Sequence, residues 1–376
     1  MKTPCYIIDE KLLTANLKLL REVADDSGCK ILLAQKAFSM FAFYPLVGEY
    51  LDGTTSSGLH EAMLANEFMP AHCADENHVF SAAYSDEEFD AVLPLCSHIV
   101  FNSFSQWDKF KERAEDSGKN FGIRVNPEIS TQGGGIYDPC ASGSRLGVTQ
   151  KNFRFDEFEK SDALNGIHFH TLCQQNADAL EITLNAVEKK FSRIFKKISW
   201  LNMGGGHHIT REDYDIEKLV AIIKNFKKKY ELEIYLEPGE AVALNAGFLV
   251  CTVLDIIENN GKIAILDASA ACHMPDVLEM PYRPDVIDSF SQSDSLYTYK
   301  LGGSTCLAGD FIGEYSFKNP LIIGSKIIFE DMAIYSMVKN TTFNGINLPS
   351  IAIRRANGDV QIIRRFGYDD FKNRLS

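Results

Sequence analysis

The sequence predicts an α/β protein: a (β/α)8 TIM-type barrel followed by a second, mostly β domain that is barrel-like. Short apolar runs alternate with longer amphipathic stretches, and eight such strand-helix units fit into roughly 210 residues, the count and size of this barrel. After Pro238 the pattern changes to apolar runs separated by Gly, Pro and Asn turns, which is typical of β structure. A doubly wound open sheet is the alternative for the first part.

The predicted barrel strands are the short apolar runs at 30–35, 50–54, 78–82, 98–102, 121–126, 166–170, 199–203 and 233–237. The predicted helices are the amphipathic stretches at 10–24, 59–68, 86–95, 105–117, 176–190 and 211–230. In the first helix, five leucines are spaced for one buried face: Leu12, Leu13, Leu17, Leu19 and Leu20.

We expect the barrel to span 10–240, with 1–9 and 241–376 forming the second domain. The strands of that domain are predicted at 248–257, 262–267, 297–301, 326–330 and 351–355. The first strand, at 5–9, precedes the first barrel helix without a partner of its own. It is therefore a candidate to join the second domain.

Composition limits the function classes. The chain has 51 acidic and 38 basic residues and a formal net charge of −13, which disfavours nucleic acid and would attract a cationic small molecule. Simple solubility is the alternative explanation of this charge. No run approaches the ~18 apolar residues of a membrane span, so no membrane partner is expected. Nine scattered cysteines without a CxxC pair favour reduced thiols in a cytoplasm.

Because barrel chemistry takes place at the carboxyl ends of the strands, the polar residues there are the candidates. Lys36 follows the apolar run 31–34 directly. Desolvation lowers the pKa of a lysine and makes it a Schiff-base nucleophile. A lysine that reaches out to solvent is the alternative.

The sixth strand ends with two histidines, His168 and His170, on one face because strand side chains alternate. A metal pair is conceivable, but no carboxylate-and-histidine set at other strand ends completes it, so no metal is expected. An aromatic face for stacking is the better functional interpretation, and a core histidine is the alternative. The segments 54–58 and 124–127, at the ends of the second and fifth strands, either bond an anion or cap the next helix.

The seventh and eighth strands end in a glycine run and a glutamate. Three glycines, Gly204, Gly205 and Gly206, let backbone N–H groups approach a phosphate, although a flexible turn would look the same. Glu237 is placed to keep a pyridine nitrogen protonated, or else is a surface residue before a turn. A Schiff-base lysine, a stacking ring, a phosphate nest and a pyridinium partner together predict pyridoxal 5′-phosphate as the cofactor.

These motifs, over essentially the whole chain, resemble the fold-type III pyridoxal-phosphate enzymes. This alanine-racemase-like group includes the ornithine, diaminopimelate and carboxynorspermidine decarboxylases. The resemblance makes Lys36 the cofactor lysine, His170 the ring that stacks on the cofactor, 204–206 the phosphate loop and Glu237 the partner of the pyridine nitrogen. It also implies a head-to-tail homodimer with shared active sites.

The resemblance extends to the second domain. The segment 303–310 resembles the loop that a partner subunit contributes to the site, where Cys306 would return a proton to the substrate carbon. Tyr335 falls in the segment whose tyrosine touches the phosphate, and 343–345 resembles the segment that follows it.

Two departures from the family pattern point to the substrate. The usual Glu-Pro-Gly-Arg here ends in Glu240, and the acidic residue that often follows the loop cysteine is Leu307. A glutamate suits an amine where an arginine suits an anion. The stretch 272–284, which contains Asp276, also resembles the carboxynorspermidine (carboxyspermidine) branch. We therefore expect Glu240, Asp276 and Asp310 to bind substrate.

The predicted function is decarboxylation of carboxynorspermidine, carboxyspermidine or both to norspermidine or spermidine, in polyamine biosynthesis. A diaminopimelate or ornithine decarboxylase on the same fold is the first alternative. A racemase, a metal-dependent barrel hydrolase built on the two histidines, and a non-catalytic carrier of the cofactor are the others.

Overall fold

The computed structural model describes residues 2–133, 135–290 and 296–376. The chain forms two compact units, Asn16–Val242 and Met1–Ala15 with Ala243–Ser376. The first unit has a cluster of buried side chains inside its ring of strands: Leu32, Val100, Trp200 and Tyr235. The second has a larger core of its own, which includes Tyr6, Leu249 and Phe329.

Eight parallel strands in the described part of the first unit close into a barrel, which confirms the predicted fold. They are β2 (Lys30–Ala34), β3 (Gly53–Ser56), β4 (Asn77–Phe80), β5 (His98–Phe101), β6 (Asn120–Asn126), β8 (Leu164–His168), β9 (Trp200–Asn202) and β10 (Glu233–Leu236). Pairing of β10 with β2 and of β5 with β6 completes the ring. The short strand β7 (Val148–Thr149) pairs with the carboxyl end of β6.

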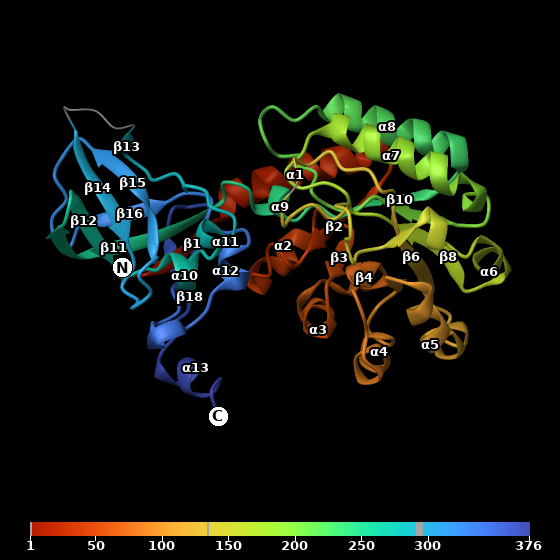
Figure 1. Cartoon of the computed structure of the whole chain (residues 1–376), viewed down its shortest axis with the longest axis horizontal. Helices are drawn as coiled ribbons and strands as arrows, with labels where there is room; N and C mark the ends of the chain where they lie inside the picture. The colour runs from red at the N-terminus through yellow and green to blue at the C-terminus, as the bar shows by residue number, and fades with distance from the viewer. Residues whose placement is uncertain (1, 134, 291–295) are drawn as a thin grey trace. The chain divides into compact units, whose positions relative to one another are not determined.

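Helices α3 to α8 lie outside the ring of strands (Figure 1). The helices of this part of the chain are α1 (Glu10–Ser27), α2 (Tyr44–Gly48), α3 (Leu59–Phe68), α4 (Asp86–Val92), α5 (Phe104–Glu115), α6 (Phe155–Lys160), α7 (Ala177–Phe191), α8 (Ile216–Tyr230) and α9 (Glu240–Ala243). Short 3-10 turns lie at Phe41–Phe43, Ala71–Glu76, Gln150–Asn152 and Ser192–Ile194. No helix in the described ranges is both long and apolar enough to span a membrane.

Side chains that cap helices explain where several of them begin. Ser85 accepts from the Glu88 N–H in a capping box before α4, and Asp215 accepts from the Lys218 N–H before α8. One detail of the predicted first helix was wrong. Leu13, Leu17 and Leu20 are buried, but Leu12 is 41% exposed, since neighbouring residues on a helix point about 100° apart.

The second unit is mostly β, as predicted. Its strands are β1 (Cys5–Asp9), β11 (Gly247–Glu258), β12 (Lys262–Leu266), β13 (Ser289–Phe290), β14 (Tyr297–Gly302), β15 (Phe311–Phe317), β16 (Lys326–Phe329), β17 (Ser350–Arg354) and β18 (Val360–Arg364). Strand β1 pairs antiparallel with β11 and parallel with β17, two strands of this unit. The remaining helical segments are α10 (Ala270–His273), α11 (Asp276–Glu279), α12 (Ser336–Lys339), α13 (Tyr368–Lys372) and the turn Phe343–Gly345.

Candidate active site

Four neighbouring strands of the barrel, β8, β9, β10 and β2, carry the predicted cofactor residues just beyond their carboxyl ends. A cavity there is lined by Lys36, Arg124, His168, His170 and Glu237, with side chains of β3 and β4 completing its wall. A wider cavity of about 580 Å³ shares Lys36, Arg124 and His170. The first cavity therefore brings together Lys36, His170 and Glu237, although Lys36 and Glu237 lie 201 positions apart in the sequence.

The Lys36 side chain is exposed, but the space that it faces is this cavity, whose walls are protein atoms. Desolvation lowers the pKa of its ammonium group, Arg124 lowers the pKa further, and Glu237 opposes both. A lowered pKa increases the fraction of neutral amine, which is the form that attacks a carbonyl carbon. The local electrostatics therefore favour the nucleophilic interpretation over a lysine that merely reaches solvent.

Glu237 is held by two side chains from neighbouring strands. Asn202 Nδ2 donates to Oε1 at 2.7 Å, and His168 Nε2 lies 3.1 Å from Oε2. Burial by itself would raise the pKa of Glu237, but the nearby His168, together with His78 and Thr55, lowers the pKa to about 2. The carboxylate is therefore anionic at neutral pH, although its side chain is only 11% exposed.

His170 is a neutral ring in a defined orientation. The Gly205 N–H donates to His170 Nδ1 at 2.8 Å, so Nδ1 carries no hydrogen and Nε2 carries the proton. Burial lowers the pKa of His170 well below its usual range, and the positive charge of Lys36 adds to the effect. An uncharged aromatic face at this position suits stacking on a flat ring.

The glycine run packs too closely for side chains. A Cβ on Gly204, Gly205 or Gly206 would lie 2.0–2.4 Å from the backbone oxygens of Phe169, Glu237 and Leu172, respectively. The N–H groups of Gly204 and Gly205 already donate to Asn202 and His170. Close packing of the strand ends therefore requires glycine at these three positions. Their role in binding phosphate stays a prediction, and it rests mainly on Gly206.

Glu240 is the first residue of α9, three positions beyond Glu237. It is half-buried, and its Oε1 accepts a hydrogen bond from Gln174 Nε2 at 2.8 Å. The glutamine follows the sixth barrel strand. The predicted substrate carboxylate is thus tied to the segment that carries His170.

The other predicted site residues belong to the second unit. Cys306 is exposed, and its N–H donates to Asn344 Oδ1 at 2.7 Å. Asp310 is buried and accepts from Thr305 Oγ1 at 2.6 Å, which closes the loop that carries Cys306. The roles of Cys306 and Asp310 in the reaction stay predictions.

Two more predicted residues of this unit have distinctive surroundings. Asp276 forms an ion pair with Lys339 at 2.5 Å, so a substrate ammonium group would have to compete with this lysine. Tyr335 has a φ of 54° and a ψ of −36°, a backbone conformation that is strained for a bulky residue and is found where the surrounding structure enforces it. Their roles in binding substrate and phosphate stay predictions.

Comparison with known proteins identifies the family. A protein-family model described as "Pyridoxal-dependent decarboxylase, C-terminal sheet domain" matches residues 5–333. The chain belongs to the pyridoxal-dependent decarboxylases. The predicted family is therefore confirmed, and the metal-dependent hydrolase is not supported.

Individual members of the pyridoxal-dependent decarboxylases resemble the chain over its full length. A carboxynorspermidine/carboxyspermidine decarboxylase of Campylobacter jejuni is 44% identical over 100% of this chain and 98% of the relative. A carboxyaminopropylagmatine decarboxylase of Synechocystis sp. is 41% identical over 100% and 96%. The crystal structure of the C. jejuni carboxynorspermidine decarboxylase complexed with norspermidine covers 100% of both chains with a TM-score of 0.90 and 44% identity.

The barrel cavity fits the cofactor of this decarboxylase family. Its lining offers an amine of lowered pKa, an anionic carboxylate and a neutral aromatic ring, and the glycine segment without side chains lies at a neighbouring strand end. These are the groups needed to bind, respectively, an aldehyde, a protonated pyridine nitrogen, a flat ring and a phosphate.

Two side chains of this site have roles that the sequence does not predict. For His168 the sequence allows a metal pair, a stacking face or a core residue, whereas the structure shows that it contacts Glu237 and stacks on Phe80 with ring centroids 5.6 Å apart. Asn202 was not singled out. Its signal was a polar side chain within a short apolar strand, which must find a partner when it is fully buried.

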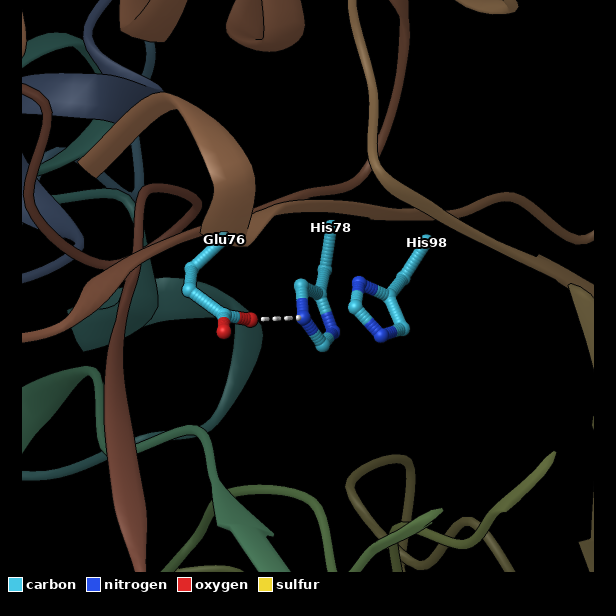
Figure 2. Close-up of side chains that lie close together, drawn as sticks. All are labelled: Glu76, His78 and His98. Carbon is cyan, nitrogen blue, oxygen red and sulfur yellow. Dashed lines mark hydrogen bonds and ion pairs between the residues drawn. The ribbon is translucent and has the colours of Figure 1, made fainter. Parts of the chain in front are cut away.

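A separate cluster of possible metal ligands, the only one found among the described residues, lies at the other end of the barrel. Glu76, His78 and His98 have ligand atoms within 4.8 Å of one another, at the start of β4 and β5 (Figure 2). The two rings stack with centroids 4.0 Å apart and planes 19° apart, so their in-plane lone pairs do not converge on one point. Lys30 already pairs with Glu76. The geometry is that of a packed polar layer.

Proposed function

We propose that the protein decarboxylates carboxynorspermidine, carboxyspermidine or both, with norspermidine or spermidine as the product. The observation that carries the proposal is an anionic residue, Glu240, three positions after the buried Glu237 at one end of the barrel. The full-length similarity to the C. jejuni enzyme supports the same substrate class. The net charge of −13 also favours a cationic substrate.

Pyridoxal phosphate, when bound, supplies an aldehyde that condenses with amines and a ring that accepts the electron pair left when CO2 departs. Lys36 Nζ, with its lowered pKa, is the amine that would hold this aldehyde. Glu237 would hold a proton on the pyridine nitrogen because its own carboxylate stays anionic. His170 would stack on the ring, and Gly204–Gly206 and Tyr335 would hold the phosphate.

We assign the return of a proton to the substrate carbon to Cys306 Sγ of a second copy of the chain. This assignment requires a homodimer with shared sites and predicts that a separated monomer is inactive. Its support is an exposed thiol on a loop that Asp310 and Asn344 hold in place. All nine cysteines are free thiols, which supports our proposal that the protein works in the cytoplasm.

The experiment that tests the function is a CO2-release assay with five substrates: carboxynorspermidine, carboxyspermidine, carboxyaminopropylagmatine, diaminopimelate and ornithine. The proposal expects the highest kcat/KM with one of the first two. The 41% identity to the Synechocystis enzyme makes carboxyaminopropylagmatine the second candidate. A higher kcat/KM with any of the last three substrates would overturn the assignment.

A further inference from the structure

The hydrogen bond between Gln174 and Glu240 gives the predicted substrate carboxylate an unusual partner. Gln174 Nε2 donates to Glu240 Oε1 at 2.8 Å across 66 positions of sequence. The amide is a neutral donor, so it fixes the direction of the carboxylate without neutralising it. Asp276, by contrast, is paired with the ammonium group of Lys339. The hydrogen bond from Gln174 therefore gives the Glu240 carboxylate a set orientation.

The backbone of Gln174 is held in place by its surroundings. Its φ of 53° lies in the left-handed region, which costs free energy for a residue with a side chain. The Gln174 carbonyl accepts from Arg211 Nη1 at 3.2 Å, and Arg211 is in turn paired with Asp213. The next residue, Gln175, donates its N–H to the Gly206 carbonyl at 3.0 Å. These contacts enforce the strained turn that aims the side chain at Glu240.

We propose that Gln174 is a positioning residue that orients the Glu240 carboxylate toward an ammonium group of the polyamine substrate. The proposal rests on the proposed function, because it assumes that Glu240 binds a cationic substrate. Gln174 acts through Glu240 and not on the reacting atoms. It therefore sets KM for the substrate and leaves kcat and the affinity for pyridoxal phosphate to the residues of the cavity.

Two substitutions separate this role from a structural one. Gln174→Gly removes the amide and relieves the left-handed backbone. It should raise KM for carboxynorspermidine about 3- to 10-fold, the size of one typical hydrogen bond at an exposed position, with kcat within about twofold and Tm unchanged or higher. Gln174→Lys places an ammonium group beside Glu240 and should raise KM further. The control is Gln150→Ala, which removes the hydrogen bond that another exposed glutamine donates to the Lys190 carbonyl. It should change neither KM nor kcat.

A double-mutant cycle decides whether the effect passes through Glu240. In a Glu240→Gln background, with its own raised KM, Gln174→Gly should add less than about twofold. The positioning role would be overturned by an unchanged KM in Gln174→Gly or by an equal effect on KM in both backgrounds. A parallel loss of Tm and cofactor affinity would also overturn it. If the wild-type protein released no CO2 from any carboxylated polyamine, the proposed function itself would fail instead.

Discussion

The substitution Asn202→Leu tests how the barrel keeps Glu237 anionic. Asn202 is fully buried, donates to Glu237 Oε1 at 2.7 Å and accepts from the Gly204 N–H at 2.8 Å. Leucine has nearly the same shape but neither group. The hydrogen bond to the charged Glu237 contributes about 1.5–3 kcal/mol to the free energy of unfolding, and the neutral bond from the Gly204 N–H contributes about 0.5–1.5 kcal/mol. We therefore expect the substitution to lower the free energy of unfolding by about 2–4.5 kcal/mol. For a unit of this size that lowers Tm by about 4–9 °C.

The effect of Asn202→Leu on Tm should depend on pH. The pKa of Glu237 is lowered in the folded protein to about 2, so the stability it contributes is complete above the unfolded pKa, about 4.3, and is lost as pH falls toward the folded value. Loss of the Asn202 donor should raise that pKa, because a hydrogen bond to the anionic form favours it. The Tm difference from wild type should therefore be greatest above about pH 5 and shrink as pH falls.

The assay is thermal unfolding of the ligand-free protein by circular dichroism between pH 3 and pH 8. Asn165→Leu is the matched control, because it also removes two side-chain hydrogen bonds, to Asn120 and Trp200, but neither involves a charge. Its Tm difference should not depend on pH in this range. A pH-independent loss for Asn202→Leu, equal to that of the control, would refute the claim that Asn202 stabilises an anionic Glu237.

Three further predictions concern the cofactor, the dimer and the substrate. Gly205→Ala should lower the free energy of unfolding by about 1–3 kcal/mol and weaken cofactor binding, since its Cβ would lie 2.2 Å from the Glu237 carbonyl. Gly367→Ala is the control and should be neutral, because open space surrounds Gly367; equal Tm values for the two variants would contradict the prediction. A mixture of inactive Lys36→Ala and Cys306→Ala chains should recover up to about a quarter of wild-type activity by forming mixed dimers, and no recovery would argue against shared sites. Glu240→Gln should raise KM for carboxynorspermidine without changing cofactor affinity, and an equal loss of both would assign Glu240 to the cofactor.

The barrel and the placement of its main site residues were predictable because they follow from local pattern. Apolar runs identified the eight strands, and the rule that chemistry lies at carboxyl ends selected Lys36, His170 and Glu237. Strand β15 and helix α6 are among the elements that the sequence does not predict. Strand β15, at Phe311–Phe317, includes Gly313 and Glu314, and this breaks the apolar run on which the prediction depended.

Contacts between distant segments were not predictable from one sequence. Nothing near Asn202 in the chain indicates that its amide meets Glu237, and Gln174 and Glu240 are joined only because β8 and β10 end at the same side of the barrel. The sequence predicts phosphate binding by the glycine run from its position between a strand and a helix and from the family resemblance. Its requirement for close backbone packing becomes visible only when the three strand ends are in place.

The central claim is that the amine of Lys36 condenses with pyridoxal phosphate inside the barrel. The most direct measurement is the visible spectrum of the purified protein as pyridoxal phosphate is added, for wild type and Lys36→Ala in parallel. We predict a protonated, lysine-bound chromophore that makes the wild type yellow and shifts on addition of carboxynorspermidine, and its loss in Lys36→Ala. A colourless wild-type protein that does not respond to the cofactor, or a variant that keeps the same spectrum, would contradict the account.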